Sequence, residues 1–297
     1  MSDVTKAILL NLIATFLLAV MGALIKLLGN YYPAQELSLF RNMIGMIPTL
    51  IILFWVREWH QSGRPIRIRQ WKLALSRGVF VAIAQFFFFL PLARMDLATV
   101  STLVLATPVF LTLLSVPVLQ DRVGPIRWLA VFIGLFGVIL IIRPGTDIFA
   151  LIAIMPLLAA LGYAASGVVV RLIDKSVPSA LLNLYSQLGA LIGALVIVQS
   201  SSGYQTVQSL EHWLWILAMG TFGGCGVFLL TLSYRLTQPS NIAPFGYFSI
   251  PFSFFLGWMY FDEAPLDQLF PGVILIVLSG LLIIWRDKRG PKQIESG

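Results

Sequence analysis

The sequence predicts an all-α integral membrane protein whose ten transmembrane helices form two inverted five-helix repeats. Three observations support this fold class. Only 11% of the 297 residues are charged and 58% are hydrophobic, whereas soluble proteins carry roughly 25% charged residues. Ten apolar segments are long enough to cross a bilayer core of roughly 30 Å. Landmark residues of the first half also return in the second half at a nearly constant offset.

The ten apolar segments cover most of the chain and leave little of it for a soluble domain. Each is predicted to be helical, because inside a bilayer every backbone N–H and C=O must find a partner within its own segment. The fifth is short, and it is included because Pro125 precedes it and Arg143-Pro144 follows it. The predicted spans are Val4–Leu28, Leu37–Val56, Leu73–Leu92, Thr99–Val118, Arg127–Ile142, Phe149–Val170, Ala180–Val198, Leu214–Tyr234, Ser240–Phe261 and Leu269–Trp285.

The internal repeat divides the chain into residues 4–143 and residues 148–286, followed by a cytoplasmic tail at 287–297. Because each half holds five spans, which is an odd number, the second half must enter the membrane upside down. Secondary transporters with this architecture bind substrate near the midplane, between the halves. The matched positions are Gly22 and Gly167, Lys26 and Arg171 (both at an offset of 145), Pro108 and Pro251 (143), and Asp121 and Glu263 (142).

The net charge of +7 is distributed unevenly among the predicted loops. With the N-terminus in the cytoplasm, the basic residues gather on the cytoplasmic side, and the opposite loops keep only Arg94 and Arg143. This asymmetry follows the positive-inside rule, so the basic surplus indicates orientation and not nucleic-acid binding. We expect a multi-pass protein of the bacterial inner membrane with both termini cytoplasmic. The first span is expected to be an uncleaved helix, and the single Cys225 excludes an intrachain disulfide.

Ionisable residues inside predicted spans are functional candidates, because a charge in the bilayer is costly. Asp, Glu and His all fall at span ends or in loops, so the sequence gives no support for a proton relay and leaves the coupling ion open. The cationic candidates are Lys26, Arg41, Arg77 and Arg171. Two alternatives stay open for each: the side chain snorkels to the interface, or it faces a central cavity and meets an anionic group of the substrate or takes part in gating.

The matched prolines suggest a second group of candidates. Proline removes a backbone hydrogen bond and kinks a helix, and interrupted helices at corresponding positions point to a binding site. Pro108 and Pro251 are therefore cavity or hinge candidates, although unmatched prolines elsewhere show that a plain kink is an alternative. Polar and aromatic residues near these prolines or on other spans are further cavity candidates. For each of them, a role in packing between helices is the alternative. These residues are Gln85, Phe89, Thr102, Thr107, Tyr163, Tyr247 and Ser249.

Sequence motifs for catalysis are missing from the chain. It has no H-E-x-x-H, no P-loop, no G-x-G-x-x-G between a strand and a helix, and no acid pair placed for general acid/base work. We therefore expect no enzymatic activity, no cofactor and no metal site. Because no ATP-hydrolysing part exists, a transporter built from this chain would run on gradients.

The chain resembles the EamA type of the drug/metabolite transporter superfamily along nearly its whole length. It departs from the family pattern at two positions. Met21 stands where the family often has Trp, and Asp121 stands after the fourth span where the family has Glu; the corresponding residue of the second half, Glu263, does match the family. The resemblance implies a ten-helix carrier with a cavity formed chiefly by spans one, three, four, six, eight and nine. The residues that carry it are Ala19-x-x-Gly22-x-x-x-Lys26, Phe40-Arg41, Leu92-Ala-Arg94 with Ala98–Pro108, Asp121-Arg-Val-Gly124 with Trp128–Gly137, Tyr234-Arg-Leu, Ala243-Pro244 and Asp262-Glu263-Ala-Pro265.

Relatives of this type handle amino acids, S-adenosylmethionine, riboflavin or opine metallophores, so the resemblance leaves the cargo open. We expect a secondary transporter of small organic metabolites that works by alternating access and exports amino acids or related zwitterions. An importer of a nucleotide- or vitamin-like metabolite is the alternative within this class. A membrane-embedded enzyme or a scaffold is the alternative outside it. The expected partners are the lipid bilayer and a small-molecule metabolite, with monomer and homodimer both open.

Overall fold

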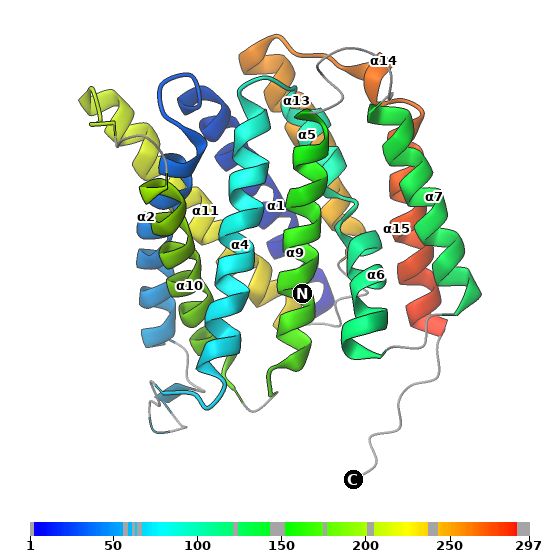
Figure 1. Cartoon of the computed structure of the whole chain (residues 1–297), viewed down its shortest axis with the longest axis horizontal. Coiled ribbons are helices and arrows are strands. Elements are labelled where there is room, and N and C mark those ends of the chain that lie inside the picture. The colour runs from blue at the N-terminus through cyan, green and yellow to red at the C-terminus, as the bar shows by residue number, and fades with distance from the viewer. Residues whose placement is uncertain are drawn as a thin grey trace.

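The computed structural model describes residues 3–55, 59–60, 63, 67–120, 124–142, 152–174, 177–200, 205–236 and 243–289. Within these ranges the regular structure is helical, and the long helices run side by side in one bundle (Figure 1). The predicted landmarks Asp121 and Arg143, and most of the predicted tail, lie outside the described residues. The elements are α1 (Asp3–Leu28), α2 (Ala34–Trp55), α4 (Trp71–Leu92), α5 (Leu97–Val104), α6 (Thr107–Leu119), α7 (Pro125–Ile142), α9 (Ile154–Leu172), α10 (Ser179–Gln199), α11 (Leu210–Leu236), η1 (Ala243–Phe248), α13 (Ser249–Phe261), α14 (Leu266–Leu269) and α15 (Gly272–Arg289).

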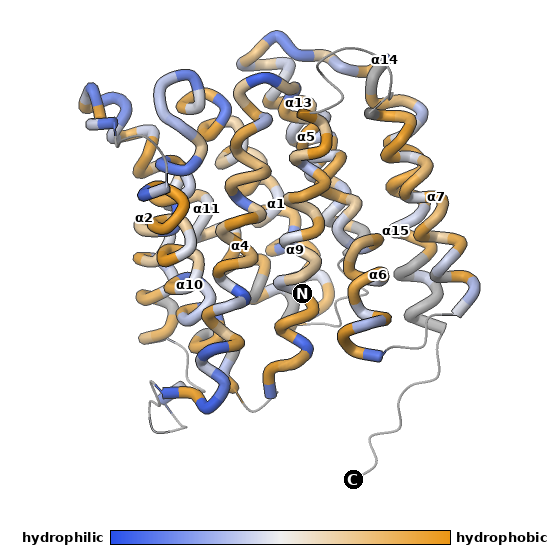
Figure 2. Tube along the Cα trace, viewed as in Figure 1, coloured by the Kyte–Doolittle hydropathy of each residue, from blue (hydrophilic) through white to orange (hydrophobic). Residues whose placement is uncertain are grey.

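These helices confirm the predicted all-α membrane fold. Among the described residues, seven helical segments are long and apolar enough to cross a membrane, with α5 and α6 counted together as Leu97–Leu119. Shorter apolar helices in α7 and α15, and the η1–α13 pair, complete the ten predicted spans. Figure 2 shows hydrophobic residues along most of the helix lengths and hydrophilic residues gathered near their ends, as a bilayer environment requires.

Helix packing follows the two-fold pattern that inverted repeats require. The helix α1 packs on α11, and its counterpart α9 packs in the same way on α4. The pair α2 and α11 is likewise matched by α10 and α4. Three further contacts join counterparts to each other: α2 to α10, α7 to α15, and the fourth span to the ninth through α5 and α13. If each helix is replaced by its counterpart in the other half, the same set of helix contacts is therefore obtained.

The contact between α4 and α10 brings two helix backbones together. A Cβ added at Gly78 would overlap the main-chain oxygen of Ser186 and lie 2.5 Å from the nitrogen of Ala190. A Cβ at Gly189 would meet the backbone of Leu75 in the same way. Small residues at such points let membrane helices approach closely, where van der Waals contact replaces a hydrophobic driving force.

The fourth and ninth spans are both interrupted near the prolines that the repeat matches. The fourth span breaks between Val104 and Thr107, and Pro108 lies in the first turn of α6. The ninth begins as the 3₁₀-helix η1 and becomes α-helical at Ser249, two residues before Pro251. Proline suits such positions, because the first turn of a helix leaves its N–H groups without intrahelical partners.

The two interrupted spans pack on each other at one end of the bundle. This end, where α1 and α13 finish and α2 and α5 begin, is called the Lys26 end below; the end that holds the start of α1 is the opposite end. At the Lys26 end α5 packs on α13. At the opposite end α6 packs mainly on α9, and η1 packs mainly on α1 and α15. The crossing spans are thus joined at one end and diverge at the other.

Candidate functional site

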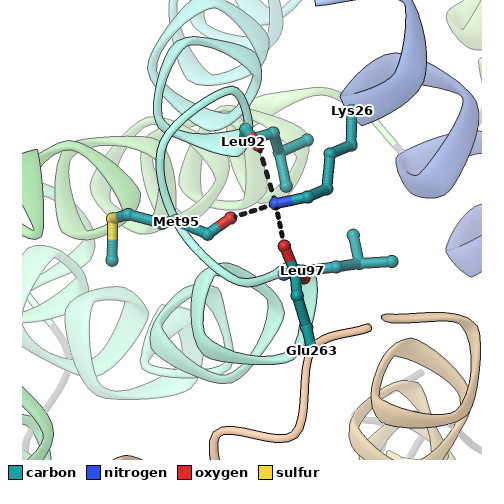
Figure 3. Close-up of polar contacts among 5 residues, drawn as sticks. All are labelled: Lys26, Leu92, Met95, Leu97 and Glu263. Atoms are coloured by element: carbon teal, nitrogen blue, oxygen red, sulfur yellow. Dashed lines mark hydrogen bonds and ion pairs between the residues drawn. The ribbon is translucent and has the colours of Figure 1, made fainter. Parts of the chain in front are cut away.

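Lys26 lies in the last turn of α1 and is bound on three sides (Figure 3). Its ammonium group forms an ion pair with Oε1 of Glu263 at 2.5 Å. The same group donates hydrogen bonds to the main-chain oxygens of Leu92, at 3.1 Å, and Met95, at 2.6 Å. A lysine ammonium has three donors and no acceptor, so this set of three oxygens satisfies it.

Glu263 owes its position to the way α13 ends. Asp262 caps the helix in the left-handed conformation with φ 55°, and the backbone N–H of Glu263 then donates to the oxygen of Gly257 at 3.1 Å. The Oε2 atom of Glu263 accepts a hydrogen bond from the backbone nitrogen of Leu97 at 3.0 Å. The carboxylate therefore bridges Lys26 on α1 and the first residue of α5.

The cluster of Lys26, Glu263 and the main chain of 92–97, called the gate cluster below, joins elements from both halves of the chain. The two charged side chains are only 11% and 16% exposed, and the ring of Phe261 lies 5.5 Å below the Lys26 nitrogen. Charge-assisted hydrogen bonds are stronger than neutral ones, and partial burial reduces their screening by water. The cluster therefore stabilises the closed contact of α1, α5 and α13 at the Lys26 end.

Sequence reasoning included Lys26 among the site residues but missed its partner Glu263. A usable signal was present, because Lys26 and Glu263 each lie at the end of a predicted span, and the predicted topology places both ends on the same side of the membrane. The role of the two main-chain oxygens could not be read from the side chains, because it depends on how residues 93–96 connect α4 to α5.

A second polar cluster lies inside the bundle, between α2, α4 and α10. Nη1 of Arg41 donates to Oδ1 of Asn42 at 2.9 Å. Nδ2 of Asn42 donates to Oε1 of Gln85 at 2.7 Å, and Ser38 donates to the same oxygen at 3.1 Å. Nε2 of Gln187 donates to the main-chain oxygen of Asn42 at 3.2 Å. Arg41, Asn42 and Gln85 are 6%, 0% and 2% exposed, so protein surrounds this network.

Arg41 brings a charge into this network without a compensating acid. Among the described residues no carboxylate forms an ion pair with Arg41; the pairs of Lys6 with Asp3 and of Lys26 with Glu263 lie elsewhere. Its Nε atom is buried and has no hydrogen-bond partner. Tyr163, which the sequence also predicted for the cavity, is close enough to Arg41 to interact with it electrostatically. The structure thus brings the predicted residues Arg41, Gln85 and Tyr163 together.

The remaining predicted residues are more scattered. The hydroxyls of Thr102 and Thr107 bond to main-chain oxygens of their own span, those of Ala98 and Val104, at 2.7 and 2.6 Å. Phe89 is 3% exposed and lines a pocket of about 260 Å³ at the Lys26 end.

Arg171 is exposed at the end of α9, on the opposite end of the bundle. Pro108 and Tyr247 are half-buried, and Tyr247 lies against Gly280 of α15. The hydroxyl of Ser249 is buried without a partner, while Pro251 is exposed on the surface of α13. A hinge role for Pro251 stays a prediction. Within the described ranges, no group of three or more His, Cys, Asp or Glu is placed to hold a metal ion.

Comparison with known proteins gives consistent matches over the whole chain. The model of the EamA-like transporter family matches residues 5–143 and again residues 150–285. The pseudopaline exporter CntI of Pseudomonas aeruginosa is 27% identical over 290 residues, which are 97% of this chain and 99% of that protein. A riboflavin transporter of Brucella anthropi is 25% identical over 258 residues, 86% of this chain and 89% of its own. A solved crystal structure with 17% sequence identity shares the fold, with a TM-score of 0.63 over 97% of this chain and 99% of the other.

Proposed function

Because the chain belongs to the EamA-like transporter family, we propose that it exports amino acids or related zwitterionic metabolites across the bacterial inner membrane by alternating access. The observation that carries this proposal is the gate cluster. Lys26 comes from the first half and Glu263 from the second, so their contact can form only while the two halves meet at the Lys26 end. An alternating-access carrier needs a contact of this kind, which exists in one state and is lost in the other.

The positive-inside pattern supports an outer location for the Lys26 end, since the basic loops gather at the opposite end. The structure then corresponds to a state closed on the outside. The divergence of α6 and η1 at the opposite end supports access from the cytoplasm. A carrier resting in this state loads its cargo from the cytoplasm, as export requires.

The substrate class is supported by the chemistry of the interior and by one relative. Arg41 offers a buried positive charge that suits a substrate with a carboxylate. One relative, matched over 97% of this chain, is named an exporter of pseudopaline. The second candidate, an importer of a vitamin-like metabolite, is supported by the riboflavin transporter among the relatives. The gradient that drives transport is left to experiment.

Solute counterflow in proteoliposomes tests this proposal. Vesicles preloaded with one pool of unlabelled solute are given the labelled solute outside, for amino acids, S-adenosylmethionine and riboflavin in turn, with and without a pH gradient. We expect transient accumulation of at least one amino acid. Accumulation of riboflavin or S-adenosylmethionine alone would support the second candidate, an importer of a vitamin-like metabolite, and would contradict the export of amino acids. No exchange of any pool by folded protein would contradict the transport of these solutes altogether.

Direction needs a separate measurement in oriented membranes. Inside-out vesicles expose the cytoplasmic face, so an exporter accumulates its substrate in them under an imposed gradient. We expect net accumulation in inside-out vesicles and net loss from preloaded cells. Net uptake into intact cells at the expense of the same gradient would contradict export.

A further inference from the structure

We propose that the guanidinium group of Arg41 is the carboxylate-binding subsite of this carrier. The inference rests on the proposed function, because it assumes that a small solute reaches the interior of the bundle. It goes further by assigning one chemical group of the substrate to one side chain. Four observations support it: the burial of Arg41, its unused donor, the flexible side chain of Met21 beside that donor, and the depth of Arg41 in the bundle relative to the gate cluster.

The burial of Arg41 argues against snorkelling, the common explanation for an arginine in a membrane span. A long cationic side chain near a helix end can reach the interface and keep its charge in water. Arg41 is 6% exposed, so protein encloses it on almost every side and the interface is out of reach. Arginine stays protonated in proteins, and an uncompensated buried charge is strongly unfavourable. A site of this kind is completed by an anion.

The donors of Arg41 are only partly used. A guanidinium group has five N–H donors in a planar fork. Nη1 is held by Oδ1 of Asn42, whereas the Nε donor is buried and has no partner. Asn42 and Gln85 are neutral, so their network orients the guanidinium without cancelling its charge. A carboxylate matches the open edge of the fork, because its two oxygens can accept two parallel N–H bonds.

The open donor lies beside a glycine. A Cβ added at Gly223 of α11 would lie 3.2 Å from Nε of Arg41 and 2.6 Å from Sδ of Met21. Met21 and the backbone of α11 therefore fill the place beside this edge of the guanidinium, and a ligand can reach it only when the Met21 side chain moves. The flexible side chain of Met21 is the neighbour that most easily gives way to a ligand.

The subsite lies deeper in the bundle than the gate cluster. Met21 marks the level of Arg41 on α1, and Lys26 follows it by five residues, which is about 7.5 Å along a helix. A carboxylate bound at Arg41 would therefore lie deeper than the contact of Lys26 and Glu263 but on a different side of α1, because five residues also turn a helix by about 140°.

Arg77 provides a matched contrast on α4. It also has a buried Nε without a partner, and its Nη1 donates to Ser186 of α10 at 2.6 Å. Arg77 is only half-buried, however, and lies in the second turn of its helix at the opposite end. Its guanidinium group is held by Ser186 of α10, so we assign it to the packing of α4 on α10. Arg77→Gln therefore makes the same chemical change outside the proposed subsite.

Thermal unfolding of the purified full-length protein in detergent tests the subsite independently of transport. The probes are L-amino acids, each compared with its own C-terminal amide, which keeps the side chain and ammonium but lacks the carboxylate. We expect at least one amino acid to raise the unfolding temperature and its amide to leave it unchanged. Arg41→Gln should weaken the apparent affinity for that amino acid roughly 10- to 100-fold, as expected for the loss of hydrogen bonds to a charged group.

Two further variants complete the experiment. Arg41→Lys keeps the charge but loses the fork, so its affinity should fall between those of wild type and Arg41→Gln. Arg77→Gln should bind like wild type. Should Arg41→Gln fail to fold, Arg41→Lys and the acid–amide comparison on the wild type still decide the question. Equal stabilisation by acid and amide, unchanged affinity in the Arg41 variants, or no stabilisation by any amino acid would each overturn the subsite.

Counterflow of the same amino acids separates this inference from the proposed function. Amino acids that bind through Arg41 but are not exchanged would leave the subsite standing and refute transport. Amino acids that are exchanged equally by wild type and Arg41→Gln would leave transport standing and refute the subsite.

Discussion

Replacing Lys26 by methionine should open the Lys26 end of the bundle far more often. The contact between Lys26 and Glu263 exists only while α1 and α13 are together, so it contributes to the closed state alone. Breaking a fully buried pair costs about 3–5 kcal/mol, and an exposed pair contributes at most about 1 kcal/mol. With side chains 11% and 16% exposed, a value of about 2 kcal/mol lies between these limits. Since 1.4 kcal/mol is a factor of ten, the open population should rise about 30-fold.

Cysteine labelling measures this population. In a Cys225→Ser background, Thr102→Cys places a thiol on α5 below the gate cluster, at a position that is 0% exposed. With the Lys26 end on the outside, as proposed, a membrane-impermeant maleimide added to intact cells reaches this thiol only while that end is open. We expect Lys26→Met to speed labelling by about 30-fold, in line with the energy above. Lys6→Met is the matched control, because Lys6 forms only an exposed pair with Asp3 at 3.9 Å.

A charge reversal distinguishes the gate cluster from a simple ion pair. The double variant K26E/E263K would preserve opposite charges, but the carboxylate at position 26 would face the main-chain oxygens of Leu92 and Met95, which now accept from Lys26. We therefore expect fast labelling in the reversed protein as well. Labelling that stays slow in Lys26→Met, or a reversed pair that restores the wild-type rate, would refute the proposed gate.

The remaining predictions concern packing and the interrupted spans. Gly78→Val should destabilise the protein by about 1–3 kcal/mol, read as a lower unfolding temperature in detergent, because the side chain would meet main-chain atoms of α10. Gly246→Ala is its control, since an added methyl meets no atom within 4 Å there. Pro108→Ala and Pro251→Ala should slow counterflow severalfold at unchanged protein level, because a restored N–H favours a continuous helix. Pro117→Ala, near the end of α6, should have little effect, and equal rates in all three proline variants would contradict the hinge.

Much of the fold followed from the sequence because membrane spans impose a strong compositional pattern. Boundaries were less predictable, since a helix can extend beyond its apolar window. The helix α11 begins at Leu210, four residues before the predicted Leu214. Its first turn carries Glu211, which lowers the local hydropathy yet suits the positive end of a helix dipole. The helix α4 likewise begins at Trp71, before the predicted Leu73, and includes Lys72.

The candidate site was predictable only in part. Intramembrane charge singled out Lys26 and Arg41, because that signal depends on residue type and position alone. Whether each side chain meets water, a protein carboxylate or an open space depends on neighbours from distant spans. Lys26 meets Glu263, which lies 237 positions further along the chain. The burial of Arg41 depends on α2 packing against α11, and no periodicity within α2 reveals it.

Lys26 and Arg41, two of the four membrane cations that the sequence grouped together, differ in how fully they are satisfied. Lys26 has three oxygen partners, and two of them are main-chain oxygens, one of Leu92 at the end of α4 and one of Met95 in the connection to α5. In the proposed open state, in which α13 moves away with Glu263, these two oxygens can still accept from the ammonium, so Lys26 would keep partners there. Arg41 has one side-chain partner and an unused donor in a more enclosed position. The residue at the end of the bundle is therefore suited to forming and breaking a contact repeatedly, and the residue below it to receiving an anion from outside the protein.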